Sequence, residues 1–269
     1  MSLPPVMIMV APTGARKLKR DNPAIPLSPA EIAAEVARCA AAGASIAHLH
    51  ARNPDGSPTQ SLEVYREITD RIRNSCDMVL QISLGTKGFT VEQAVEPVVL
   101  KPEMVSLPLD AFRGDDAAAR EGVHEMARQV RRHGVCPELS VYDEGMLDGA
   151  MGLIRSGDVA APACFGLILA DPSSMREGVA KMMQLAAALP PQSHWWIARG
   201  GRHALGLRAL AVELGGHVRV GFEDSVLDFD ESRPAPSNAY LVERMAKLCQ
   251  ALGRRIATPA EARAAIGRA

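Results

Sequence analysis

The sequence predicts an α/β fold, a closed (β/α)8 barrel of the TIM type. Three observations lead to this fold class. Eight short apolar runs are spread along a chain of 269 residues, helix-like segments lie between them, and 47% of the residues are hydrophobic. Strands that alternate with helices form parallel sheets, and eight such units in a chain of this length favour a closed barrel over an open sheet.

The expected strands alternate with segments that carry helix start signals. Ser28 precedes Pro29 and Glu31, so a serine cap, a proline in the first turn and a capping box coincide. No Gly-rich GxGxxG motif follows the first expected strand, which disfavours a dinucleotide-binding sheet. In chain order the expected strands are residues 6–13, 45–52, 78–84, 104–109, 135–142, 164–170, 194–198 and 217–223.

The two ends of the chain complete this picture. Thr258, Pro259 and Glu261 give a cap, a proline and an acidic first turn, which predicts a short surface helix at the C-terminus. We therefore expect one barrel domain over residues 1–269 with a short C-terminal helical extension. At the N-terminus, the apolar run 6–10 has no preceding basic segment and is too short for a signal peptide or a membrane span, so we expect a cytoplasmic protein.

Charge and cysteine content exclude several classes of partner and site. Thirty basic and thirty-one acidic residues give a net charge of −1, and no long basic run is present. Nucleic acid and anionic membranes are therefore not expected partners. The five cysteines are odd in number, far apart and set among apolar residues, and none has CxxC spacing. They predict reduced, buried thiols and neither a disulfide framework nor a thiolate metal site.

Two histidines in the second expected strand give the sharpest chemical signal. Because a strand repeats every two residues, His48 and His50 place both imidazoles on one face. Catalytic zinc takes about three protein ligands and keeps one position open. Glu223 in the eighth expected strand shares the inward face with Arg219 and lies beside Asp224. Two core histidines satisfied by hydrogen bonds, and a solvated acidic pair or helix cap, are the alternatives.

The same alternation selects polar residues in the third, fourth and fifth expected strands, which would converge on one cavity. Their hydroxyls, together with the Arg219 guanidinium, suit a substrate carboxylate. Each serine taken alone could equally be a small filler of the barrel interior. No GxSxG elbow surrounds Ser83 or Ser106, so neither is expected to be a nucleophile. The selected residues are Gln81, Ser83, Ser106, Glu138 and Ser140.

Several motifs along nearly the whole chain are shared with a known family. Together they identify the sequence as one that resembles the β-keto acid cleavage enzymes. The motifs are Ala11-Pro12-Thr13-Gly14-Ala15, Ala42-Gly43-Ala44, His48-Leu49-His50-Ala51-Arg52, Gln81-Ile82-Ser83, Lys101-Pro102-Glu103-Met104, Pro137-Glu138, the stretch 215–224, Ser237-Asn238-Ala239 and the stretch 257–263.

The resemblance implies a zinc-containing (β/α)8 barrel that forms a homotetramer. It converts a β-keto acid and acetyl-CoA, a co-substrate, into acetoacetate and a new acyl-CoA. By the same resemblance, His48, His50 and Glu223 are implied to be the zinc ligands.

The resemblance also implies roles for residues around the metal. Ser83, Ser106 and Arg219 match groups that hold and activate the keto acid, and Asp224 matches the partner that tunes Arg219, so that Arg219, Asp224 and Ser83 are the implied catalytic residues. A β-keto acid can chelate zinc through its ketone and carboxylate oxygens, and removal of its C2 proton needs a nearby base. Because guanidinium is a very weak acid, the sequence leaves the identity of that base open.

Two alternative functions remain at this stage. A zinc hydrolase of the amidohydrolase type is also a barrel with a His-x-His pair. Such hydrolases place the pair on the first strand and require further histidines on later strands, whereas the fifth and sixth expected strands here carry none. The other alternative is a non-catalytic barrel that binds a ligand, which the presence of every matched metal ligand disfavours.

Substrate choice is predicted from two positions at which this chain departs from a family member that acts on an amino keto acid. That member resembles an amine binder, with glutamates where this chain has Arg16 and Ser140. Because a substrate ammonium would meet like charge at Arg16, we expect the distal group of the keto acid to be neutral or anionic. The alternative is that Arg16 points to solvent, because it is followed by Lys17, Lys19 and Arg20 in a basic loop. Thr13 and Glu138 complete the expected substrate-binding residues.

Overall fold

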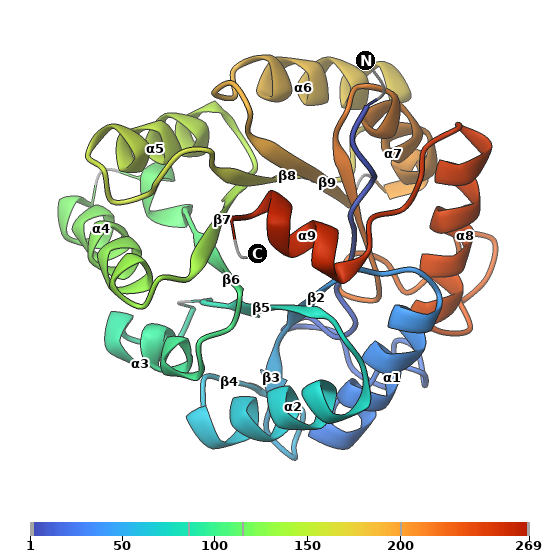
Figure 1. Cartoon of the computed structure of the whole chain (residues 1–269), viewed down its shortest axis with the longest axis horizontal. Helices are drawn as coiled ribbons and strands as arrows, with labels where there is room; N and C mark the ends of the chain where they lie inside the picture. The colour runs from blue at the N-terminus through green and yellow to red at the C-terminus, as the bar shows by residue number, and fades with distance from the viewer. Residues whose placement is uncertain (1–2, 86, 115, 200, 268–269) are drawn as a thin grey trace.

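The computed structural model describes residues 3–85, 87–114, 116–199 and 201–267. Eight parallel strands close into a barrel, in the order β1-β10-β9-β8-β7-β6-β5-β2, and helices surround it (Figure 1). The predicted (β/α)8 barrel is therefore confirmed. In such a barrel, the loops that follow the strands share one end, where side chains from different strands can meet.

All eight expected strands are present, and most are shorter than the apolar runs that predict them. The eighth expected strand ends at Val220, so Glu223 lies on the turn that follows and not within the strand. A small antiparallel hairpin outside the barrel, β3 (Ala51–Arg52) with β4 (Pro58–Thr59), was not expected. The barrel strands are β1 (Ile8–Val10), β2 (Ile46–Leu49), β5 (Val79–Ser83), β6 (Met104–Pro108), β7 (Cys136–Val141), β8 (Cys164–Leu169), β9 (His194–Arg199) and β10 (His217–Val220).

The helices cover the outside of the barrel, and the predicted capping box at Ser28 and Glu31 is present at the first of them. No helix among the described residues is long and apolar enough to cross a membrane. The helices are α1 (Pro29–Ala41), α2 (Leu62–Ser75), α3 (Val91–Val95), α4 (Ala117–Arg132), α5 (Glu144–Arg155), α6 (Met175–Ala187), α7 (Ala204–Glu213), α8 (Asn238–Ala251) and α9 (Pro259–Ala265), with 3-10 segments η1 (Glu96–Leu100), η2 (Asp110–Arg113) and η3 (Gly201–His203).

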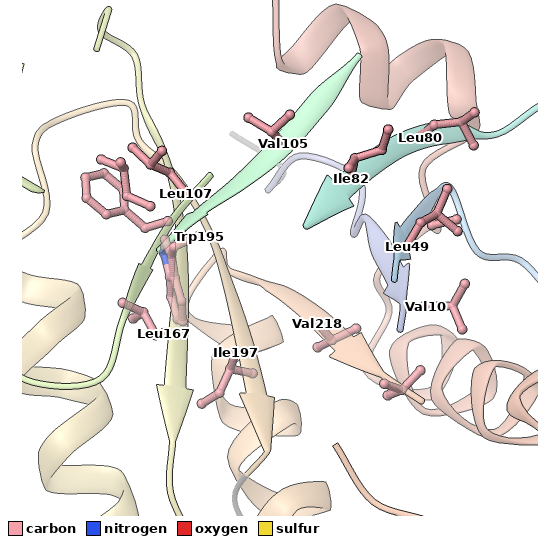
Figure 2. Packing of buried hydrophobic residues seen from close by; sticks show 14 of the residues in the cluster. Val10, Leu49, Leu80, Ile82, Val105, Leu107, Leu167, Trp195, Ile197 and Val218 are labelled. Carbon is pink, nitrogen blue, oxygen red and sulfur yellow. The ribbon is translucent and has the colours of Figure 1, made fainter. Parts of the chain in front are cut away.

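The larger hydrophobic core lies between the barrel and the helices. Successive strand residues point to opposite faces, so Leu80 and Ile82 of β5, and Val105 and Leu107 of β6, belong to this outer layer (Figure 2). All four side chains are buried. Each such side chain contributes roughly 1.5–3 kcal/mol on burial, which leaves the inward positions of the same strands available for other chemistry.

A second apolar cluster fills the barrel at the end where the strands begin. Met9, Val79 and Trp196 point inward here and pack with Ala262 and Ile266 at the C-terminus. Helix α9 therefore closes this end of the barrel, near its centre in Figure 1. The predicted short C-terminal helix is present: Ala262 faces the barrel and is fully buried, while Ala260 and Ala264 are exposed at the surface. His194 and His217 also lie at the end of the barrel where the strands begin. There His217 Nδ1 accepts a hydrogen bond from the Met7 backbone N–H at 3.2 Å, and the His217 ring packs against Trp196. The predicted site residues lie toward the other end of the barrel.

Candidate metal and substrate site

A cavity of about 270 Å³ lies at the end of the barrel where the strands finish. Ten of the predicted site residues line it, although they come from seven separate segments of the chain. Two selected residues, Gln81 and Glu138, are not part of the lining. The ten are Thr13, Arg16, His48, His50, Ser83, Ser106, Ser140, Arg219, Glu223 and Asp224.

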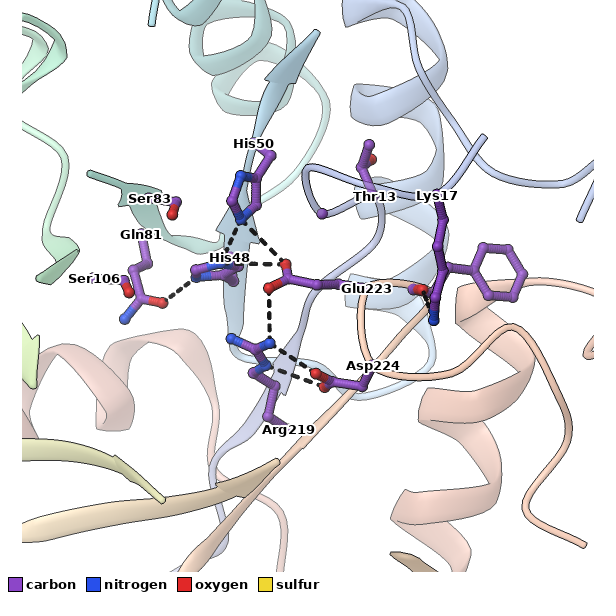
Figure 3. A network of polar contacts seen from close by, with 12 residues as sticks. Thr13, Lys17, His48, His50, Gln81, Ser83, Ser106, Arg219, Glu223 and Asp224 are labelled. Carbon is purple, nitrogen blue, oxygen red and sulfur yellow. Dashed lines mark hydrogen bonds and ion pairs between the residues drawn. The ribbon is translucent and has the colours of Figure 1, made fainter. Parts of the chain in front are cut away.

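Three possible metal ligands converge at one side of this cavity (Figure 3). The Nε2 atoms of His48 and His50 are 3.1 Å apart, and each lies 3.3 Å from Glu223 Oε2. Ligand atoms at about 2.0–2.1 Å from a tetrahedral zinc lie roughly 3.3 Å from one another, which matches this triangle. Among the residues that the structure describes, this is the one group of three or more His, Cys, Asp or Glu side chains able to hold a metal ion.

The electrostatics of His50 and Glu223 favour metal-binding forms of both side chains. Burial lowers the pKa of His50 despite the nearby Glu223 carboxylate, which favours the neutral imidazole. Burial alone would raise the pKa of Glu223, but the Arg219 guanidinium and the two imidazoles outweigh it and hold this pKa well below its usual range. Glu223 Oε2 is buried without a hydrogen-bond partner, as expected of an oxygen that faces a cation.

A chain of buried side chains fixes the orientation of His48. The His48 Nδ1–H donates to Gln81 Oε1 at 2.6 Å, and Gln81 Nε2 donates to Glu138 Oε2 at 3.0 Å. This leaves the lone pair of His48 Nε2 directed at the triangle. Glu138 is buried and so supports the metal site from beneath; it does not line the cavity as the substrate-binding prediction required. Gly166 on β8 makes room for it, since a Cβ there would lie 2.4 Å from Glu138 Oε1.

We expect Gln81→Met to weaken metal binding by about 10- to 100-fold, the usual effect of losing a partner of a metal-ligating histidine. The variant removes the acceptor at 2.6 Å from His48 Nδ1 and keeps all three ligands. Competition with a chromophoric chelator measures the change. Gln129→Met on α4 is the matched control, and equal affinities in the two variants would show that Gln81 does not orient His48.

Arg219 and Asp224 form a buried ion pair next to the triangle. Arg219 Nε and Nη2 donate to the two Asp224 carboxylate oxygens at 3.1 and 2.7 Å, and Nη2 also donates to Glu223 Oε1 at 2.9 Å. Although burial alone would lower it, the Asp224 and Glu223 carboxylates raise the pKa of Arg219 well above its usual value. The guanidinium is therefore firmly protonated, and among the described residues its Nη1 has no hydrogen-bond partner.

Two glycines allow the chain to place Glu223. Gly221 has φ +136°, and a Cβ there would lie 2.3 Å from the Ala11 carbonyl oxygen. Gly14 has φ +67°, and a Cβ there would lie 2.6 Å from Glu223 Cγ. Both positions combine a left-handed backbone with a close approach, which only glycine accepts. Gly221 and Gly14 thus let Glu223, which lies on a turn, approach the imidazoles of His48 and His50.

The serine and threonine predictions have different outcomes. Ser83 and Ser106 lie at the ends of neighbouring strands and both line the cavity. The Ser106 and Ser140 hydroxyls are 3.1 Å apart, and the Ser140 hydroxyl donates to Glu138 at 3.5 Å. The Thr13 hydroxyl donates to the Pro26 carbonyl at 2.8 Å, so it is turned toward the protein. Ser83 and Ser106 are thus the hydroxyls best placed for a substrate.

Sequence reasoning missed two basic residues of the lining. Arg199 is the last residue of β9, one position beyond the expected strand 194–198, and it lines the cavity. Lys17 was treated as part of a solvated loop, yet its Nζ donates to the Phe222 carbonyl at 3.0 Å and it lines the cavity too. The exposed Arg16 side chain lies at the same rim. A basic residue at the end of an apolar run was the signal that could have identified Arg199.

Comparison with known proteins finds one matching family and several similar enzymes. The profile of the beta-keto acid cleavage enzyme family matches residues 5–267. A 3-keto-5-aminohexanoate cleavage enzyme of Fusobacterium nucleatum is 39% identical over 264 residues, 96% of this chain and 96% of that protein. A 3-oxoadipate:acetyl-CoA acetyltransferase of Cupriavidus necator is 31% identical, over 98% of this chain and 95% of that protein.

Solved structures support the fold. The apo structure of ObcA superposes with a TM-score of 0.73 at 19% identity, over 91% of this chain and 66% of that one. At this identity the likeness extends to the barrel alone. The match of the family profile over nearly the full length, together with relatives above 30% identity, shows that the chain belongs to the β-keto acid cleavage enzyme family.

Proposed function

We propose that this chain is a zinc-dependent enzyme that transfers an acyl group from a β-keto acid to coenzyme A. The co-substrate is acetyl-CoA, and the products are acetoacetate and a new acyl-CoA. The observation that carries the proposal is the meeting, in one cavity, of a three-ligand metal triangle and the Arg219–Asp224 ion pair. The family and the acetyl-CoA transferases among the relatives agree with it.

The three ligands fit zinc by donor type and by spacing. Two neutral imidazoles and one carboxylate are a usual set for catalytic zinc, and their atoms lie 3.1–3.3 Å apart. The unpartnered Glu223 Oε2 completes the fit. When bound, zinc supplies Lewis-acid stabilisation of negative charge on the ketone and carboxylate oxygens of a β-keto acid.

The chain itself holds the substrate beside this triangle. Arg219 Nη1 is not used by Asp224 or Glu223 and can donate to an oxygen of the keto acid. The hydroxyls of Ser83 and Ser106, which end adjacent strands, can donate to the substrate carboxylate. Donors on rigid strands are preorganised, so they need little rearrangement when charge develops on the substrate.

The Arg219–Asp224 pair removes the proton from C2 of the keto acid. Because Arg219 stays protonated in this environment, the proton goes to an oxygen of the Asp224 carboxylate, which Arg219 holds in the cavity lining. The resulting C2 carbanion attacks the acetyl carbonyl of acetyl-CoA. A carbon–carbon bond forms, and CoA leaves as the thiolate. The thiolate then attacks the original ketone carbon, the old bond from that carbon to C2 breaks, and acyl-CoA and acetoacetate result. The pair returns the proton to the acetoacetate carbanion, which balances the reaction.

The hydrolase alternative is not favoured by the geometry. Amidohydrolase-type sites need histidines beyond the first pair. In the described parts of the chain, the one cluster suited to a metal contains His48, His50 and Glu223 and no further histidine. The mixed donor set next to a guanidinium fits activation of a keto acid better than activation of water by several imidazoles.

The experiment that tests the proposal is a coupled assay of purified protein with acetyl-CoA and single β-keto acids. We expect acetoacetate and the matching acyl-CoA to form in equal amounts, because each turnover breaks one bond and forms one. Acetoacetate and acyl-CoA are quantified by mass spectrometry. Release of free CoA with no acyl-CoA would indicate thioester hydrolysis and contradict the proposal. A homotetramer is proposed from the resemblance, and sedimentation would test it. A cytoplasmic location is also a proposal, and fractionation would test it.

A further inference from the structure

Three basic residues gather on the lining of the same cavity. Arg16 and Lys17 lie on the loop after β1, and Arg199 ends β9. Lys17 and Arg199 also line a second cavity of about 310 Å³, so the two cavities adjoin at these side chains. The metal triangle and the Arg219–Asp224 pair do not require any of the three.

Arg199 is the most unusual of them. Its backbone has φ +62°, the left-handed region that costs a residue with a side chain of this size roughly 1–3 kcal/mol. Its Nε is buried and has no hydrogen-bond partner. Among the described residues, the Arg199 side chain has no ion-pair partner either. A guanidinium on a left-handed backbone, with a buried Nε that has no partner and a side chain that lines a cavity, calls for an explanation, and a bound anion would supply one.

The acidic residues of the lining do not neutralise these cations. Glu223 and Asp224 are both bonded to Arg219. Asp110 is exposed at the rim, and its carboxylate lies 3.7 Å from Arg113. Lys17 directs one N–H to the Phe222 carbonyl, and burial lowers the pKa of its ammonium although the Asp224, Glu223 and Asp21 carboxylates act in the opposite direction. Among its described residues, the lining carries four cations, Arg16, Lys17, Arg199 and Arg219, against three carboxylates, Asp110, Glu223 and Asp224. Cations are thus in excess by one, and the part of the cavity next to Arg16 and Arg199 attracts negative charge.

We infer that the preferred β-keto acid carries a second carboxylate at its distal end, bound by Arg199, with Arg16 on the lining of the same cavity. This inference rests on the proposed function and narrows its substrate to β-keto dicarboxylates. A guanidinium binds a carboxylate through paired hydrogen bonds, which gives both affinity and orientation. A distal ammonium would meet like charges instead.

A different anion could use the same cations, namely the phosphates of coenzyme A. The two sources differ in their kinetic consequence. If Arg199 holds the keto acid, its loss changes the ranking of keto acids. If it holds coenzyme A, its loss raises the KM for acetyl-CoA by the same factor with every keto acid.

The test compares three keto acids with acetyl-CoA: 3-oxoadipate, 3-oxohexanoate, which has a methyl in place of the distal carboxylate, and 3-keto-5-aminohexanoate. For the unmodified enzyme we expect the highest kcat/KM with 3-oxoadipate and the lowest with the amino compound. In Arg199→Met, the ratio of kcat/KM for 3-oxoadipate over 3-oxohexanoate should fall about 10- to 100-fold, the effect of a lost charged hydrogen-bond pair. Arg16→Glu should lower the same ratio.

Controls separate this result from loss of folding. Arg199→Lys should keep part of the ratio, and Arg202→Met, on the exposed segment η3, should keep all of it. Zinc content and circular dichroism report the fold of each variant. A preference of the unmodified enzyme for 3-oxohexanoate or the amino compound, or an unchanged ratio in Arg199→Met with a raised KM for acetyl-CoA, would overturn the inference. Absence of turnover with all three acids would instead overturn the proposed function, and the inference with it.

Discussion

His48→Ala is expected to lose both the bound metal and turnover, with kcat/KM reduced by at least about 10³-fold. Charge stabilisation by a metal contributes several kcal/mol, and each ~1.4 kcal/mol is tenfold in rate. His48 Nε2 is one corner of a triangle with sides of 3.1–3.3 Å, so its removal leaves two ligands. Metal analysis and the coupled assay measure the two effects in the same preparation.

The barrel should remain folded in this variant, because the apolar core lies between strands and helices and at the opposite end of the barrel. His133→Ala, at the exposed end of α4, is the matched control and should retain metal and activity. A His48→Ala protein that keeps its metal and full turnover would remove His48 from the ligand set.

Asp224→Asn is expected to lower kcat by about 10²- to 10⁴-fold, the range found when an acid–base group is lost, with metal content unchanged. The substitution keeps the shape of the side chain and removes its charge. Both Asp224 oxygens accept hydrogen bonds from Arg219, and neither belongs to the metal triangle. Steady-state kinetics and metal analysis separate the two functions.

Asp230→Asn is a suitable control, since Asp230 is exposed on the loop between β10 and α8. It should leave kcat as it is. Wild-type turnover in Asp224→Asn would reduce Asp224 to a structural neighbour of Arg219, and a loss of metal in that variant would show that the pair holds Glu223 and does not act on the substrate.

The fold and the convergence of His48, His50 and Glu223 were the most predictable features of this chain. Eight apolar runs gave the eight barrel strands, because a parallel strand buried on both faces needs such a run. The period of two placed His48 and His50 on one face, and the same rule brought Ser83 and Ser106 to the cavity. The alternation of side chains along a strand is therefore enough to predict which residues face the cavity where the strand is regular.

Features that depend on irregular backbone or on distant contacts could not be predicted. Glu223 leaves the strand on a turn that Gly221 allows, although it still reaches the two imidazoles. Glu138 follows the inward alternation, but it lies below the cavity because Gln81 covers it and Gly166 makes room. The direction of the Thr13 hydroxyl depends on Pro26, thirteen residues away.

Reconstitution of metal-free protein with zinc tests the central claim most directly. Protein stripped with a chelator is titrated with zinc, and acetoacetate formation from 3-oxoadipate and acetyl-CoA is followed at each step. The three-ligand site predicts no turnover without metal, a linear rise, and an end point near one zinc per chain. Full turnover in the stripped protein, or no turnover at any zinc content, would contradict the account of this cavity as a zinc site for β-keto acid cleavage.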